Sequence, residues 1–104
     1  ATLRMFYRLG ARYMTLTHWE TIDWADAATD SAKHDGLTAF GEQVVLEMNR
    51  VGMVVDCSHM GARSTLEMMA LSEQPVVFSH SNPRALCAHG RNITDEHAQD
   101  HAQR

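Results

Sequence analysis

Three short apolar runs in this 104-residue chain each end in a histidine. The runs cover residues 13–18, 53–59 and 76–80, and their last residues are His18, His59 and His80. Each run is too short for a buried helix and is rich in apolar residues, so each predicts a strand. Helix-patterned sequence lies between the runs, and this order favours an α/β fold with parallel strands joined by crossovers. Because the carboxyl ends of parallel strands form one rim, we expect the three histidines on the same rim.

Apolar spacing and capping residues predict the remaining elements. Helices are expected at residues 3–9, 38–51 and 62–71, directly after Pro83, and from Thr94 onward. Residues 19–36 form a polar connection that is long for a compact domain. Long ordered loops of this kind are commonly functional.

Composition narrows the classes of function. The formal net charge is -4, and no basic patch of the kind that nucleic-acid binding requires is present. No apolar stretch approaches the roughly 20 residues of a membrane span, and no signal-peptide pattern opens the chain. Two cysteines, Cys57 and Cys87, are too few for a disulfide framework, so we expect free thiols. Free thiols favour a reducing compartment and a cytoplasmic location, and a secreted or membrane-anchored full-length protein stays open as the alternative.

The length of the chain limits the domain that it can form. Three strands and four helices cannot close a barrel, which typically takes about 250 residues. The chain begins at Ala1 without a start methionine and ends at Arg104 within a helical pattern. We therefore expect residues 1–104 to be a section of a larger domain, incomplete at both ends. Unpaired strand edges in such a section favour assembly with other chains, including a homo-oligomer.

A histidine at a strand end can be a metal ligand, a general base or a hydrogen-bonded core residue. The core role is the commoner one for a single histidine, but three on one rim favour a functional site. His59 and His80 end runs that are joined by one short crossover, so we expect them on neighbouring strands about 4.8 Å apart. Imidazoles at that spacing can share or flank one metal ion, and imidazole suits zinc.

Several linked motifs, spread over nearly the whole chain, carry a family resemblance. In order, they are YMTLTH (13–18), WAD (24–26), GLTAFG (36–41), EMNR (47–50), VDCSH (55–59), PVVFSHS (75–81) and GRNITDE (90–96). With these motifs the chain resembles the membrane (renal) dipeptidase family. The resemblance implies a metal-dependent hydrolase of the (β/α)₈ TIM-barrel type, of which residues 1–104 form about three βα units.

The resemblance also implies an activity and a site. The family hydrolyses dipeptides at a binuclear zinc centre, where a metal-bridging hydroxide attacks the scissile carbonyl. By motif match, His59 and His80 correspond to the two histidines that bind one of the zinc ions. His18 corresponds to the catalytic histidine that contacts the substrate and stabilises the oxyanion. Arg91 corresponds to the arginine that binds the substrate near its carboxylate.

The chain also departs from the family pattern. The early His-x-Asp pair, the bridging glutamate and the late aspartate of the family have no counterpart in residues 1–104. We therefore expect this chain alone to bind zinc weakly and to be inactive. Residues 19–23, which read WETID, replace an asparagine-rich turn found in many members, so the substrate preference stays open.

Other polar residues are interpreted more plainly. We expect Asp56 to support the end of its strand, and the alternative is a hydrogen-bonded partner of a neighbouring ligand. We expect Asp26 to order a turn rather than to form part of the pocket wall. His97 and His101 have an i, i+4 spacing, but no HExxH pattern frames them, and we expect a solvated helix face. Methionines on helical faces are interpreted as core residues, namely Met48, Met68 and Met69.

Two alternatives to a dipeptidase stay open. One is another metal-dependent, amidohydrolase-type barrel that acts on lactams or other cyclic amides, which parallel assays on dipeptides and cyclic amides distinguish. The other is a non-catalytic structural or binding fragment in which the histidines merely fill the rim. A zinc titration with and without His59 or His80 separates this last alternative from a metal site.

Overall fold

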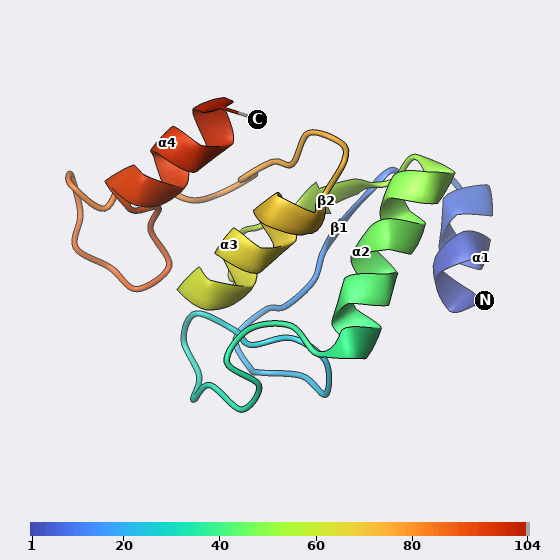
Figure 1. Ribbon diagram of the computed structural model, residues 1–104, viewed down its shortest axis with the longest axis horizontal. Helices are drawn as coiled ribbons and strands as arrows, with labels where there is room; N and C mark the ends of the chain where they lie inside the picture. The colour runs from blue at the N-terminus through green and yellow to red at the C-terminus, as the bar shows by residue number, and fades with distance from the viewer. Residues whose placement is uncertain (104) are drawn as a thin grey trace.

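Two parallel strands, covered by helices, form the centre of the fold. The computed structural model describes residues 1–103. Its elements are α1 (Thr2–Arg8), β1 (Tyr13–Thr15), α2 (Ala39–Val51), β2 (Val54–Asp56), α3 (Ala62–Leu71) and α4 (Asp95–Gln103). The helices lie side by side in chain order, with α2 and α3 in front of the strands (Figure 1). This mixed α/β arrangement agrees with the predicted α/β class.

The sheet is shorter than the sequence predicts. β1 pairs with β2 in parallel, with Met14 opposite Val55. Residues 76–80 do not form a strand, although Val77 makes one parallel bridge to Asp56. No strand continues past Val77 because backbone N–H groups of the following residues donate to side chains. Ser79 N–H donates to the Asp56 carboxylate, and His80 N–H donates to the Ser58 hydroxyl, so neither extends a strand ladder.

The first two strands also stop three residues before their histidines. After β2, Ser58 N–H donates to the side chain of Asp56, and His59 has a φ of 67°. Such a left-handed backbone is uncommon for a non-glycine residue, and it turns the chain away from the sheet. On the β1 side, the Thr17 hydroxyl donates to the carbonyl oxygen of His59 at 3.0 Å. Side-chain contacts therefore replace strand pairing at the rim.

Helix α2 has the ends that the sequence predicts. The Thr38 hydroxyl accepts a hydrogen bond from Gly41 N–H at 3.2 Å, which caps the first turn. Gly52 ends the helix in the left-handed conformation with a φ of 90°. A Cβ at Gly41 would lie 2.3 Å from the backbone oxygen of Trp24, so a glycine is required there. This close contact ties the start of α2 to the long loop.

Apolar side chains fill the space between the helices and the strands. Met48 of α2 and Met68 and Met69 of α3 are buried, as predicted. They belong to one core cluster, which also contains Leu16, Ala25, Leu37, Val45, Met53, Val55, Cys57, Met60 and Val76. The core lies under α2 and α3, and it continues to the strand ends through Cys57 and Met60.

The predicted helix after Pro83 is wrong. Residues 82–94 form turns that close on themselves through a parallel bridge between Pro83 and Ile93. Arg84 N–H donates to the Ile93 carbonyl at 2.7 Å, and Ile93 N–H donates to the Asn82 carbonyl at 2.9 Å. The Asn82 carbonyl, which would accept the first hydrogen bond of such a helix, therefore bonds Ile93 instead. Both cysteines are free, as predicted, with Cys57 buried and Cys87 exposed in this loop.

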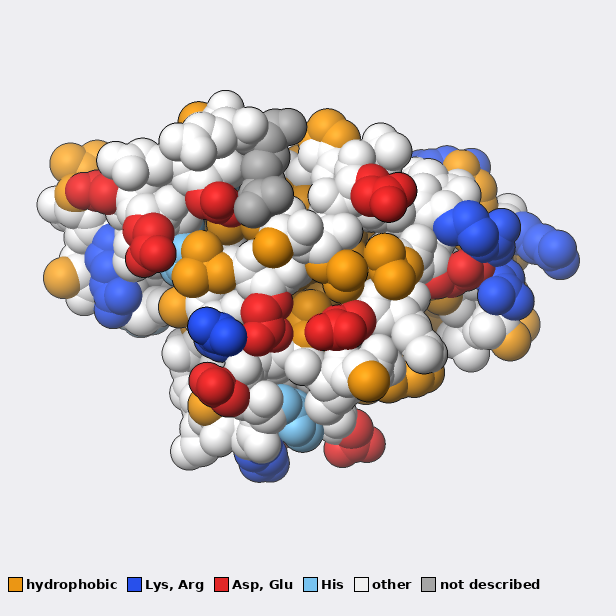
Figure 2. Space-filling view, in the orientation of Figure 1, with side chains coloured by type: hydrophobic (Ala, Val, Ile, Leu, Met, Phe, Trp, Pro, Cys, Tyr) orange, Lys and Arg blue, Asp and Glu red, His pale blue; other side chains and the backbone are white. Residues whose placement is uncertain are grey.

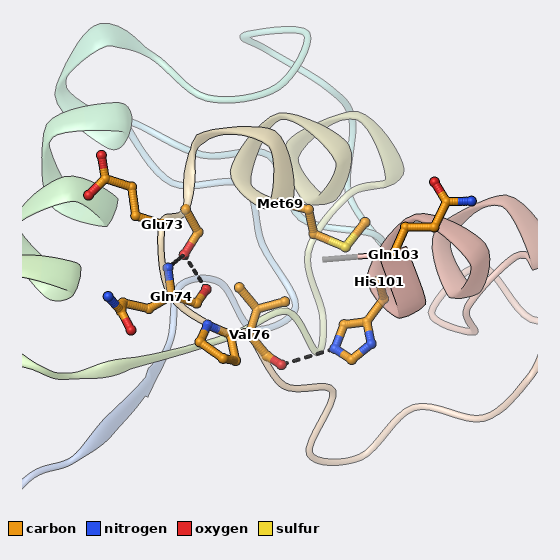
Figure 3. A pocket seen from close by; sticks show the side chains of 8 residues that line it. Met69, Glu73, Gln74, Val76, His101 and Gln103 are labelled. Carbon is orange, nitrogen blue, oxygen red and sulfur yellow. Dashed lines mark hydrogen bonds between the residues drawn. The ribbon is translucent and has the colours of Figure 1, made fainter.

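Helix α4 begins at its predicted cap, where the Thr94 hydroxyl accepts from His97 N–H at 3.2 Å. The predicted solvated face is wrong for His97, which is 6% exposed because α4 packs against α3. His101 is exposed, and its Nε2 lies 3.0 Å from the Val76 carbonyl oxygen (Figure 3). It borders a cavity of about 470 Å³ between α3 and α4, together with Met69, Glu73, Gln74, Val76 and Gln103.

Charged side chains form an ion-pair network at the end of the molecule formed by α1 and the end of α2. Figure 2 shows basic side chains around α1 and the end of α2. Glu47 pairs there with Arg4 and Arg50, each at 2.6 Å. Hydrogen bonds from Arg50 and Arg4 lower the pKa of Glu47 to about 2.

No helix within residues 1–103 is both long enough and apolar enough to cross a membrane.

Candidate active site

The structure brings His18, His59 and His80, the histidines that end the three apolar runs, into one cluster. The ring centroids of His18 and His59 are 4.4 Å apart, with their planes tilted by 37°. Those of His59 and His80 are 4.8 Å apart, with a tilt of 57°. His59 therefore lies between the other two. Residues from three segments of the chain meet at this rim, as the parallel arrangement predicts.

His59 is the fixed and buried member of the cluster, with 3% of its surface exposed. Its left-handed backbone is held by two bonds to its carbonyl oxygen, from Ala28 N–H at 2.8 Å and the Thr17 hydroxyl at 3.0 Å. Burial lowers the pKa of its imidazole, and the Arg91 guanidinium lowers that pKa further. A neutral imidazole is the form that binds metal. Its Nδ1 is buried and has no hydrogen-bond partner among the described residues.

His80 is exposed and is oriented by the residues around it. Its backbone N–H donates to the Ser58 hydroxyl at 3.1 Å. Its Nδ1 lies 2.6 Å from the hydroxyl oxygen of Ser79. The Ser79 hydroxyl in turn contacts the Asp56 carboxylate at 2.5 Å. His80 is thus linked to a buried carboxylate through one serine.

Asp56 holds the ends of three segments together. Its carboxylate accepts hydrogen bonds from the Thr15 hydroxyl, from Ser58 N–H, and from both the N–H and the hydroxyl of Ser79. Burial opposes ionisation of Asp56, but these donors prevail and lower its pKa to about 2. The interpretation of Asp56 as a support for the strand end is confirmed by these contacts.

Arg91 and Trp19 form a wall beside the histidines. The guanidinium carbon of Arg91 lies 5.3 Å from the Trp19 ring centroid, and Arg91 Nη2 donates to the His80 carbonyl at 3.2 Å. Arg91 Nε is buried and has no hydrogen-bond partner in the described part of the chain. The Trp19 ring also contacts the rings of His59 and His18, at 5.0 and 5.2 Å. Sequence reasoning assigned no role to Trp19, and its one signal was the replaced turn after His18.

The long loop of residues 19–36 supports this rim through a hydrogen bond to the His59 backbone. Asp26 is buried, and it accepts hydrogen bonds from the backbone N–H groups of Lys33, His34 and Gly36. Burial raises the pKa of Asp26, but the three N–H donors outweigh it, and the pKa falls below its ordinary value. The predicted turn-ordering role of Asp26 is therefore confirmed. The loop that it orders provides the Ala28 N–H that fixes His59.

Two imidazoles of the cluster fit the role of zinc ligands. His59 carries a buried ring nitrogen without a partner, and His80 has its Nδ1 occupied by Ser79, which leaves Nε2 for another contact. Among residues 1–103, however, no three His, Cys, Asp or Glu side chains are arranged to hold a metal ion. A catalytic zinc typically takes three protein ligands. The described residues alone therefore do not make up the ligand set of a catalytic zinc.

Comparison with known proteins identifies relatives over nearly the whole chain. The sequence profile of the membrane dipeptidase family, peptidase family M19, matches residues 1–102. Dipeptidase 3 of Mus musculus is 46% identical over 101 residues, which are 92% of this chain and 20% of that protein.

Solved structures give the same result. The probable dipeptidase PvdM from Pseudomonas aeruginosa superposes with a TM-score of 0.93 at 32% identity, over 98% of this chain and 27% of that one. A metallopeptidase from Rhodobacter sphaeroides, solved with a phosphinate mimic of the dipeptide L-Ala-D-Ala, has a TM-score of 0.90 at 25% identity, over 98% and 30%. The chain thus spans between 20% and 30% of these relatives. It belongs to the membrane dipeptidase family, peptidase family M19.

Proposed function

We propose that the full-length protein containing this chain is a zinc metallo-dipeptidase. Family membership supports dipeptide hydrolysis, and one solved relative is a metallopeptidase bound to a mimic of a dipeptide. The observation that carries the proposal is the histidine cluster, with ring centroids 4.4 and 4.8 Å apart at the ends of parallel segments.

The proposal includes a (β/α)₈ barrel, of which residues 1–104 form about three βα units. β1, α2 and β2 make one parallel βα unit, and the segment after α3 continues it through the parallel bridge between Asp56 and Val77. Repetition of that unit builds such a barrel, and its active sites lie at the carboxyl ends of the strands. The histidine cluster lies at that end.

In this proposal His59 and His80 hold one of two zinc ions. When bound, zinc lowers the pKa of a water molecule and polarises a carbonyl group. His59 contributes a buried nitrogen from a rigid backbone turn, and His80 contributes an exposed one from the neighbouring segment. The fixed positions of these residues keep the cost of reorganisation low during the reaction.

His18 and Arg91 act on the substrate. The exposed His18 imidazole lies against His59, where an N–H can donate to the oxygen that becomes negative. Arg91 is held by the His80 carbonyl and by the Trp19 ring, so its guanidinium is positioned before the substrate arrives. Arginine suits recognition of a carboxylate because its planar fork matches the two oxygens. Arg91 is therefore the anchor for the carboxylate of the dipeptide.

Substitution of His59 in the full-length protein tests this proposal. We expect His59→Ala to abolish hydrolysis of dipeptides and to remove about one zinc equivalent, because a ligand of one ion is lost. Zinc is measured by elemental analysis, and turnover by release of amino acids. His101→Ala, which removes an exposed histidine of α4, is the matched control and keeps both zinc ions and activity.

Retention of both zinc ions and full turnover in His59→Ala would contradict the assignment. Parallel assays on cyclic amides test the alternative substrate class. A zinc titration of the isolated chain tests the prediction that it binds the ion weakly and is inactive. The cytoplasmic location and the homo-oligomer stay predictions.

A further inference from the structure

We propose that Ser79 is a positioning residue that sets the tautomer and orientation of His80, so that Nε2 faces the metal. The inference rests on the proposed function, because it concerns the presentation of one of the two zinc-binding histidines. It assigns a role to Ser79 and to the buried carboxylate of Asp56, neither of which binds metal or substrate in this proposal. We name the chain of contacts from Asp56 through Ser79 to His80 the relay.

The direction of the hydrogen bonds in the relay follows from counting protons. The Asp56 carboxylate is fully buried and ionised, so it can only accept hydrogen bonds. The Ser79 hydroxyl has a single proton, and its oxygen lies 2.5 Å from Asp56 Oδ2, so that proton is donated to Asp56. The same oxygen lies 2.6 Å from His80 Nδ1 and must accept there. Nδ1 therefore carries the proton, and Nε2 has the free lone pair.

The surrounding contacts agree with this direction and make it rigid. Ser79 is fixed twice to Asp56, since its backbone N–H also donates to Oδ1 at 3.1 Å. His80 N–H donates to the Ser58 hydroxyl at 3.1 Å, so the backbone at the ring is held as well. The Ser58 hydroxyl lies 3.5 Å from that of Ser79, whose second lone pair can accept its proton. No contact in the relay requires the opposite tautomer.

Such an arrangement is what a metal-binding histidine needs. Ligating histidines commonly donate their second ring N–H to a carboxylate or another acceptor, which fixes the ring and raises its basicity. His80 is exposed, so without the relay its imidazole would lack a fixed orientation. His59 is fixed differently, by burial and by its backbone turn. The two histidines of the pair are thus oriented by independent means.

The first test compares zinc affinity among variants of the full-length protein by competition with a chelator. We expect Ser79→Ala to weaken binding about 10- to 100-fold at one site, as loss of such a partner commonly does. Ser79→Thr retains the hydroxyl and is expected to restore most of the affinity. Ser81→Ala, two residues further along, is the matched control: its hydroxyl donates to Ser58 at 3.5 Å and, among the described residues, contacts no histidine ring. This variant should bind zinc as the unsubstituted protein does.

The second test reads the tautomer directly. Nitrogen NMR of the zinc-free protein, labelled at histidine, distinguishes a proton on Nδ1 from one on Nε2 of His80. We expect Nδ1–H in the unsubstituted protein and a mixture in Ser79→Ala. This measurement shows which ring nitrogen of His80 carries the proton even if Ser79→Ala fails to fold, because it needs only the unsubstituted protein.

The possible outcomes distinguish a failure of the relay from a failure of the proposed function. A proton on Nε2 of His80, or unchanged zinc affinity in a folded Ser79→Ala variant, would overturn the relay and leave the dipeptidase proposal standing. A full-length protein that binds no zinc would overturn the dipeptidase proposal, and the NMR measurement would still test the relay.

Discussion

The apolar layer under α2 and α3 and the polar rim at the strand ends adjoin each other but are stabilised differently. In the layer, Met48 and Met68 are fully buried among other apolar side chains. At the rim, the buried residues include the polar Asp56, Ser58 and His59. An apolar layer depends on volume and shape, whereas buried polar groups each need a hydrogen-bond partner. The rim is therefore the less tolerant of the two, and the substitutions below test that difference.

We expect the largest effect at the centre of the rim. Asp56→Ala leaves four donors without their acceptor, those of Thr15, Ser58 and Ser79, and should lower the free energy of unfolding by about 4 kcal/mol. Thr15→Ala removes one donor and should cost about 1 kcal/mol. Urea unfolding of the full-length protein measures both. Equal losses in the two variants would contradict the central role of Asp56.

The apolar layer should respond by loss of stability alone. Met48→Ala creates a cavity at a fully buried position and is expected to cost about 3 kcal/mol, with zinc content unchanged. Leu46→Ala, on the same helix but 43% exposed, should stay within about 0.5 kcal/mol of the unsubstituted protein. Loss of zinc from a folded Met48→Ala variant would show that the layer and the rim are not separate.

Trp19 tests the outer wall of the rim. Trp19→Ala removes the ring that lies beside the Arg91 guanidinium and is expected to raise KM for dipeptides about tenfold, which is about 1.4 kcal/mol. Trp19→Phe keeps an aromatic face and should recover most of this loss. The comparison is made from initial rates over a range of substrate concentrations. An unchanged KM in Trp19→Ala would exclude a role for this ring in substrate binding.

His97 tests a buried polar group on α4, the helix that packs against α3. Burial lowers its pKa, and Arg84 lowers it further, while Glu96 and Asp100 raise it. Because the folded pKa lies below the unfolded value of about 6.5, the unfolded chain binds more protons as the pH falls. Stability should therefore decrease from neutral pH toward acid until the folded pKa is passed.

We expect the smallest effect here, a reduced slope of Tm against pH in His97→Gln. Thermal unfolding between about pH 7.5 and 5.5 measures it. The same slope in both proteins would show that His97 is not the group responsible.

The two regions also differ in how far the sequence predicts them. The helical layer follows from local patterns, because Thr38, Gly52 and Met48 act within one helix and its own period. The helix after Pro83 was predicted from the same local signals and is wrong, since Ile93 closes that segment from ten residues away.

At the rim, the meeting of the three histidines follows from strand order. The contacts that hold them do not, because Thr17 reaches His59 and Ser79 reaches Asp56 across more than twenty residues. Trp19 was missed for the same reason, since nothing in its local sequence shows that it will stand between His59 and Arg91. Burial of His97 likewise depends on where α4 packs.

The most direct test of the central claim is a crystal structure of the full-length protein grown with zinc, with anomalous scattering measured at the zinc edge. We predict an ion coordinated by both His59 and His80, with His80 binding through Nε2 at about 2.0–2.1 Å. A zinc ion bound elsewhere, with neither histidine among its ligands, would contradict the account.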